Sequence, residues 1–149
     1  MHIFNTPTVA ALSLLFCAAS ASAADIQIKM MDKSDAEGLM AFEPTFVKAN
    51  VNDTLVFIPV GSGHNTRSLL APSGAEPWKS AYDKEFRVKL EKEGVYLYAC
   101  EAHKRMGMAG VVQVGNAGNL EEVKKKAAEE SAAMAMNKDR LSKALDKVK

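Results

Sequence analysis

The chain has 149 residues, in which 19 Lys and Arg stand against 18 Asp and Glu, so its formal net charge is +1. A charge this close to balance does not indicate a nucleic acid or a membrane surface as the partner. Residues 25–149 are enough for one domain with one hydrophobic core.

Residues 1–24 predict a signal peptide that is cleaved. They contain no Lys, Arg, Asp or Glu, and their apolar core runs from Val9 to Ala19. This core is shorter than the run of about 20 residues that a membrane-spanning helix needs. Segments 21–23 and 22–24 both fit the small-x-small pattern that precedes a cleavage site. We therefore expect an exported chain that begins at Ala24 or Asp25 and forms a single domain.

Export would leave Cys100 as the one cysteine of the mature chain, because Cys17 is removed with the signal peptide. Exported proteins reside where disulfides form. A lone cysteine in that compartment has no partner within its own chain. It must therefore be buried, paired with another chain, or bound to a ligand.

Short segments of alternating apolar and polar residues predict a mainly β domain. We expect strands over 25–30, 40–49, 54–60, 85–90, 95–98 and 109–115, with a turn over 32–38 and no assigned element over 67–70. Pro44 should confine its strand to a sheet edge or a bulge, because proline cannot donate to the hydrogen-bond ladder. Residues 71–84 predict a long connection of the kind that crosses between the sheets of a Greek-key sandwich.

The character of the chain changes at 119–149, which predicts two helices packed back on the sandwich. Asn119 and Glu122 form the capping-box pattern that begins a helix. Apolar residues then recur at helical spacing. Asn137 should end the first helix, and its side chain is suited to capping the second.

Soft metal ligands are concentrated in the loop after the 95–98 strand, where Cys100, His103 and Met108 occur together. His64, which follows a glycine-rich turn at the end of another predicted strand, can supply a second imidazole. Two imidazoles, a thiolate and a weak axial thioether make up the blue-copper electron-transfer site. Met106 competes with Met108 for the axial position. The sequence predicts a copper protein that carries electrons and is not an enzyme.

Three other classes of site use some of the same side chains. A hydrolase would use Cys100 as nucleophile and His64 or His103 as base, but no orienting third residue is evident and Met108 would be unexplained. Structural zinc sites use Cys, His or carboxylate ligands and rarely a thioether. A copper storage or delivery protein would favour exposed, exchangeable methionines over a single rigid site.

Around these ligand candidates and elsewhere, the sequence resembles the pseudoazurins, a family of small periplasmic blue copper proteins. The similar segments are 36–38, 42–44, 48–50, 53–54, 57–60, 63–65 and 106–108. The resemblance implies a cupredoxin Greek-key β-sandwich of about eight strands with two C-terminal helices. It also implies one copper ion bound by His64, Cys100, His103 and Met108.

The same resemblance implies the cellular role. It indicates a periplasmic monomer that cycles between Cu(II) and Cu(I) and donates electrons to a copper-containing nitrite reductase in denitrification. The alternative is a carrier for another periplasmic redox enzyme, in an amicyanin-like role.

Residues around the ligands are also assigned by the resemblance. Asn65 should join the His64 loop to the Cys100 loop through its side chain and donate its amide toward the cysteine sulfur, and Met40 should pack near His103. The chain departs from the family where Glu101-Ala102 replaces the common Thr-Pro. Basic side chains near the copper should steer the redox partner, and the candidates are Lys33, Lys79, Lys84, Lys104 and Arg105.

Overall fold

The computed structural model describes residues 22–149. The predicted signal peptide lies outside the described residues except for 22–24, so its cleavage stays a prediction. Within 22–149, no helix is both long enough and apolar enough to cross a membrane.

The described part of the chain contains eight strands, two α-helices and one short 3-10 helix, η1, before the last strand. Their bounds are β1 Asp25–Ser34, β2 Gly38–Glu43, β3 Phe46–Ala49, β4 Thr54–Pro59, β5 Arg67–Leu70, β6 Phe86–Lys89, β7 Gly94–Ala99, η1 Lys104–Met106, β8 Ala109–Val114, α1 Leu120–Ala133 and α2 Arg140–Leu145.

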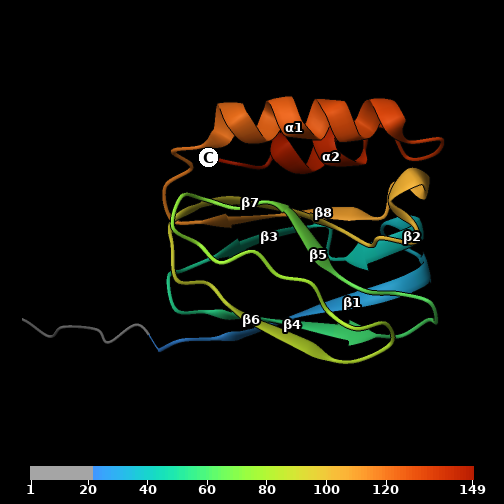
Figure 1. Cartoon of the computed structure of the whole chain (residues 1–149), viewed down its shortest axis with the longest axis horizontal. Helices are drawn as coiled ribbons and strands as arrows, with labels where there is room; N and C mark the ends of the chain where they lie inside the picture. The colour runs from blue at the N-terminus through green and yellow to red at the C-terminus, as the bar shows by residue number, and fades with distance from the viewer. Residues whose placement is uncertain (1–21) are drawn as a thin grey trace, which may run out of the picture.

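The strands form two four-stranded sheets that face each other (Figure 1). One sheet has the order β2-β1-β4-β6 and the other the order β3-β8-β7-β5. β1 runs parallel to β4 and β3 runs parallel to β8, whereas the other pairs are antiparallel. The connection over 71–84 joins β5 in one sheet to β6 in the other. The predicted Greek-key β-sandwich with a long crossing connection is therefore confirmed.

Helices α1 and α2 form a third layer that covers the sheet containing β7 and β8 (Figure 1). Apolar side chains such as Val123 and Leu141 pack there against Val95 and Val111. A second apolar core fills the space between the two sheets and contains an aromatic group around Tyr98. Both helices therefore pack back on the sandwich.

Strand β7 lies between these two cores and is buried along its whole length. Successive side chains of a strand point to opposite faces of the sheet. Val95 and Leu97 accordingly belong to the core beneath the helices, whereas Tyr96 and Tyr98 belong to the core between the sheets. The next residue in that second series is Cys100, so the alternation directs its sulfur into the sandwich at the strand's end.

Three strand predictions need correction. β1 continues to Ser34, so the expected turn over 32–38 begins later, at residues 35–37. The predicted strand over 40–49 is divided at Pro44 into β2 and β3, which belong to different sheets. The unassigned segment 67–70 is the edge strand β5, whose pairing with β7 supplies the order that its own sequence lacks.

Both predicted helix caps also need correction. Asn119 does precede α1, but its side chain does not cap the helix. It pairs instead with both backbone groups of Val95, accepting from the amide at 2.7 Å and donating to the carbonyl at 2.9 Å. α2 is preceded by Asp139 and not by Asn137, whose side chain donates to other backbone carbonyls. In both cases the asparagine side chain, which the local sequence assigns to a helix end, hydrogen-bonds instead to the backbone of another element.

Candidate metal centre

The loop between β7 and β8 lies at one end of the sandwich (Figure 1). It brings Cys100 and Met108 together. The Cys100 amide donates to the Met108 carbonyl at 3.0 Å, which closes the loop at its base. Both side chains are 0% exposed and belong to the core between the sheets. Met106, in contrast, is only partly buried and lies outside that core. The structure therefore places Met108, and not Met106, beside the buried cysteine.

His64 and His103 face each other across the same end of the sandwich. Their Nδ1 atoms are 3.2 Å apart, and the Nδ1 atom of His103 is 3.6 Å from the Cys100 sulfur. One donor atom from each of these three residues lies within 4.8 Å of the others. The two loops thus gather the predicted imidazoles and thiolate at one point, although His64 is far from the others in sequence.

The spacing of these atoms fits a single metal ion. Metal–nitrogen bonds of about 2.0 Å and metal–sulfur bonds of about 2.3 Å keep two donors on one ion within about 4.5 Å of each other. The observed separations of 3.2 and 3.6 Å are inside that limit. Imidazole nitrogen with soft sulfur favours copper among the common metals. The donor set of His64, Cys100 and His103 therefore fits copper.

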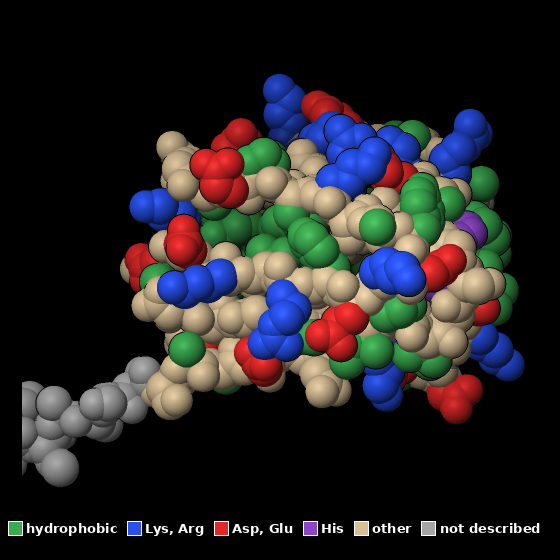
Figure 2. Space-filling model, turned by 60° about the horizontal axis from the view of Figure 1, so that its bottom comes forward, with side chains coloured by type: hydrophobic (Ala, Val, Ile, Leu, Met, Phe, Trp, Pro, Cys, Tyr) green, Lys and Arg blue, Asp and Glu red, His purple; other side chains and the backbone are tan. Residues whose placement is uncertain are grey.

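His103 is the histidine of the pair that reaches the surface. His64 is 0% exposed, whereas His103 is partly exposed. In Figure 2, histidine appears at one end of the molecule among hydrophobic side chains, with Lys and Arg spread around them. Burial lowers the pKa of His103, and the nearby His64 lowers it further. A lowered pKa favours the neutral imidazole, which is the form that can bind a metal.

Asn65 joins the His64 loop to the cysteine loop. Its side-chain oxygen accepts from the Glu101 amide at 2.9 Å, and its side-chain nitrogen donates to the Glu101 carboxylate at 3.0 Å. The expected donation from the Asn65 amide to sulfur needs correction. Among residues 22–149, the polar contacts of the Cys100 sulfur are with the Gly63 carbonyl at 4.0 Å and with His103.

Glu101 has a larger role than its sequence suggested. Besides Asn65, its carboxylate pairs with Lys79 and Arg67, each at 3.0 Å. These partners lower the pKa of Glu101, and Lys79 has the largest effect. The residue that departs from the family's Thr therefore links both loops to β5 and to the connection that carries Lys79.

Two aspartates that sequence reasoning missed hold His64 in place. The Asp83 carboxylate accepts from the His64 amide at 3.0 Å, while the Asp83 amide donates to the His64 carbonyl at 2.8 Å. The Asp32 carboxylate lies 2.8 Å from the side-chain Nε2 atom of His64. Neither aspartate lies near His64 in sequence, and no local pattern marks either one.

The five predicted docking cations are all exposed. Lys33 follows Asp32 and Lys84 follows Asp83, and both aspartates contact His64. Lys79 pairs with Glu101, and Lys104 lies 3.9 Å from Glu130. Lys104 and Arg105 directly follow His103 in the loop. Their part in docking stays a prediction.

Met40 lies at the edge of the same region. It is partly buried and packs against the core that contains Cys100 and Met108. Its backbone has a positive φ of 47°, which is unusual for a residue other than glycine. Its expected contact with His103 stays a prediction.

The segment between α1 and α2 makes hydrogen bonds to the backbone of the loop over 100–108, which we call the ligand loop. The Asn137 side chain donates to the Met106 carbonyl at 2.8 Å, and the Ala135 amide donates to the Arg105 carbonyl at 2.7 Å. Gly107 lies so close to this segment that a Cβ there would be 2.7 Å from the Asn137 Cβ. The C-terminal helices are thus attached directly to the candidate metal site.

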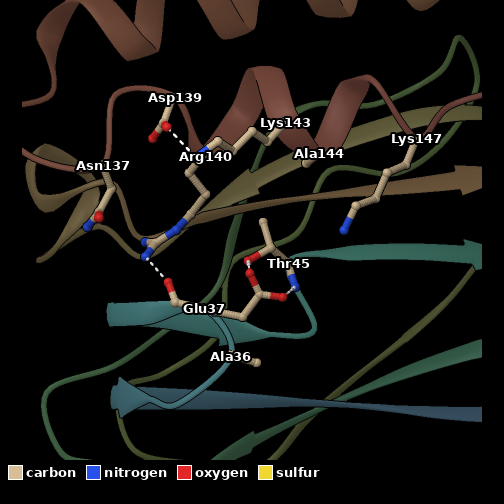
Figure 3. A pocket seen from close by; sticks show the side chains of 9 residues that line it. All are labelled: Ala36, Glu37, Thr45, Asn137, Asp139, Arg140, Lys143, Ala144 and Lys147. Carbon is tan, nitrogen blue, oxygen red and sulfur yellow. Dashed lines mark hydrogen bonds and ion pairs between the residues drawn. The ribbon is translucent and has the colours of Figure 1, made fainter.

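Arg140 makes the most extensive of these contacts. Its side chain is buried and reaches from α2 to the start of β2, where Figure 3 shows it beside Glu37. The guanidinium donates to the carbonyls of Glu37, Leu39, Met40 and Gly107 at 2.7, 3.0, 2.6 and 2.5 Å. Gly107 immediately precedes Met108, so Arg140 joins α2, β2 and the ligand loop.

Comparison with known proteins places the chain in a family. Residues 28–115 match the model of the copper binding proteins of the plastocyanin/azurin family. A pseudoazurin of Paracoccus pantotrophus is 37% identical over 118 residues, which cover 77% of this chain and 81% of that protein. A pseudoazurin of Methylorubrum extorquens is 36% identical over 129 residues, which cover 83% of this chain and 86% of that protein.

A solved structure agrees with the sequence relatives. The native pseudoazurin of Hyphomicrobium denitrificans superposes with a TM-score of 0.76 at 36% identity, covering 84% of this chain and 98% of that one. The chain therefore belongs to the pseudoazurins, within the plastocyanin/azurin family of copper-binding proteins, and copper is its cofactor.

Proposed function

We propose that His64, Cys100, His103 and Met108 are the four ligands of one copper ion in this electron carrier. One observation supports the proposal above the others: the β4–β5 and β7–β8 loops bring two imidazoles to 3.2 Å from each other and one of them to 3.6 Å from a buried thiol. Met108 is buried in the core that contains that thiol. Bound copper supplies the one-electron couple between Cu(II) and Cu(I).

The protein fixes the positions of these donors and shields them from water. His64, Cys100 and Met108 are each 0% exposed, so these three proposed donors are shielded from water. Hydrogen bonds across the base of the loop, and between Asp83 and the His64 backbone, fix the backbone that carries these donors. Donors that are fixed in this way move little when the charge of the site changes, and this favours fast electron transfer.

His103 is the proposed point of contact with the redox partner, because it is the proposed ligand that reaches the surface. We place the protein in the periplasm as a monomer that donates electrons to a copper-containing nitrite reductase. The predicted signal peptide and the resemblance to periplasmic pseudoazurins support this role. Another periplasmic redox enzyme is the alternative partner.

The axial ligand is tested by two leucine substitutions. Met108→Leu should change the visible spectrum and raise the reduction potential by about 60 mV or more, which corresponds to a tenfold shift of the Cu(II)/Cu(I) equilibrium. The physical reason is that loss of the thioether removes a donor that stabilises Cu(II). Met106→Leu is the matched control and should leave both unchanged. If Met106→Leu alone altered them, the axial assignment would be wrong.

Partner docking is tested by neutralising two cations beside His103. Lys104→Gln combined with Arg105→Gln should slow electron transfer to nitrite reductase about tenfold at low ionic strength, because these charges steer the encounter. The difference should fade in high salt, where surface charges are screened. Stopped-flow kinetics over a range of salt concentrations measures both effects.

Lys124→Gln combined with Lys125→Gln gives the matched control. It removes the same charge from α1, about 15 Å along the helix from the end that contacts the ligand loop. If both double variants slowed electron transfer equally, the rate would depend on net charge and not on the location of Lys104 and Arg105.

A further inference from the structure

The two ring nitrogens of His64 face different partners. Nδ1 lies 3.2 Å from the Nδ1 atom of His103 and points to the proposed copper site. Nε2 lies 2.8 Å from a carboxylate oxygen of Asp32. The histidine is completely buried, whereas the side chain of Asp32 is 56% exposed. A solvent-facing charge thus touches the buried imidazole on the side away from the proposed copper site.

The fold builds this contact from β1 and the glycine-rich turn. The amides of Val60 and Gly61 both donate to the Met30 carbonyl, at 3.0 and 3.2 Å, and this docks the turn on β1. Asp32 lies two residues further along β1 and fits closely against Gly61. A Cβ at Gly61 would lie 2.6 Å from the Asp32 carboxylate. Glycine at this position therefore leaves the space through which Asp32 reaches His64.

We propose that Asp32 is a positioning residue that fixes His64 as a copper ligand and lowers the reduction potential of the site. The proposal rests on the proposed role of His64 as a ligand. The carboxylate accepts the Nε2 proton, which leaves the Nδ1 lone pair free and directed at the copper. A carboxylate on the outer nitrogen also makes the imidazole a stronger donor.

The direction of the effect follows from charge. A stronger donor and a nearby negative charge both stabilise Cu(II) relative to Cu(I), which carries one positive charge less. Removing the charge of Asp32 should therefore favour Cu(I) and raise the potential. An acceptor with a full charge also holds the ring more firmly than a neutral one.

The first test compares two aspartates that lie three residues apart. Asp32→Asn should shift the Cu(II)/Cu(I) equilibrium about tenfold toward Cu(I), equivalent to a potential rise of about 59 mV. Asp35→Asn removes the same charge from an exposed position and should shift the equilibrium much less. Voltammetry of the copper-loaded proteins measures both. Equal shifts in the two variants would overturn the proposal.

A second variant separates contact from charge. Gly61→Ala keeps the Asp32 carboxylate but places a methyl group in the space that the carboxylate occupies. Asp32 must therefore move away from His64. The potential should rise as it does in Asp32→Asn. An unchanged potential in Gly61→Ala would show that the hydrogen bond does not tune the site.

Nitrogen-15 NMR of the metal-free protein gives a readout without copper. The parent protein should hold His64 with its proton on Nε2, and Gly61→Ala should lose this preference. If the parent protein instead carries the proton on Nδ1, the proposal fails. If the copper-loaded parent lacks the sulfur-to-copper band, the proposed function fails instead, so the two failures are distinguishable.

Discussion

Replacing Cys100 with serine is expected to abolish the intense visible band of the oxidised, copper-loaded protein. That band requires a thiolate bound to Cu(II), and a serine hydroxyl is a harder donor that stays protonated near neutral pH. Substituting a residue that merely supports a ligand typically costs about 10- to 100-fold in metal affinity. Loss of a direct ligand should cost more. Absorption and paramagnetic resonance spectra with a copper titration measure both effects.

Ala99→Ser is the matched control for this variant. It adds a hydroxyl one residue earlier on the same buried strand, where the side chain packs on the helix side of the sheet. A buried hydroxyl without a partner costs about 1–3 kcal/mol, but the thiolate remains and the blue band should persist. If the Cys100→Ser protein still turned blue with copper, another residue would have to supply the anionic donor, and the proposed ligand set would be wrong.

The grouping of three proposed ligands in the loop between β7 and β8 was predictable because these residues lie close together in the sequence. Cys100, His103 and Met108 lie in one turn between two strands, where their types and spacing are visible in the sequence. His64 lies much further away, yet it could be proposed because few histidines are available and it follows a strand end. Family resemblance, and not spacing, favoured Met108 over Met106. The burial of Met108 beside Cys100 adds a structural reason for that choice.

Apart from the Asn65 bridge, which the family resemblance implied, the contacts that hold the proposed ligands were not predictable, because each joins segments that are distant in sequence. Asp32 lies 32 residues from His64, and Arg140 lies 33 residues from Gly107. Single carboxylates and arginines are common on loops and helices, and nothing local distinguishes one that reaches a buried partner. The missed strand β5 has the same cause, since its order comes from pairing with β7.

Asn119 and Asn137 show how local rules fail when a tertiary partner is available. Both residues fit the preference of asparagine for helix ends. Asn119 instead pairs with both backbone groups of Val95 in β7, and Asn137 donates to the carbonyls of Leu39 and Met106. A side chain that satisfies backbone groups of buried strands or loops contributes more there than at an exposed cap.

Replacing Arg140 with methionine is expected to give the largest loss of stability of any variant considered. Arg140 is 6% exposed, and its guanidinium donates to four backbone carbonyls, which methionine cannot do. A buried acceptor left without a donor costs about 1–3 kcal/mol, and these costs do not add fully when the groups share one site. We expect a loss of about 4 kcal/mol, a large part of the 5–15 kcal/mol typical of a domain.

Urea denaturation of the metal-free protein measures this loss without interference from copper binding. Arg140→Lys should fall between the parent and Arg140→Met, since an ammonium has three donors and lacks the planar fork that reaches four acceptors. Arg87→Met is the matched control, because it removes an exposed arginine that pairs with Asp25 at the surface. Such surface pairs contribute little, so this variant should unfold close to the parent.

Arg140→Met should also affect the copper site, because the Gly107 carbonyl, immediately before Met108, loses its hydrogen bond from Arg140. Loosening Met108, the proposed fourth ligand, should change the visible spectrum of Arg140→Met while leaving that of Arg87→Met unchanged. If Arg140→Met proved as stable as Arg87→Met and kept the parent spectrum, α2 would cover the sheet without holding the ligand loop. A loss of stability with an unchanged spectrum would limit the role of Arg140 to joining α2 and β2.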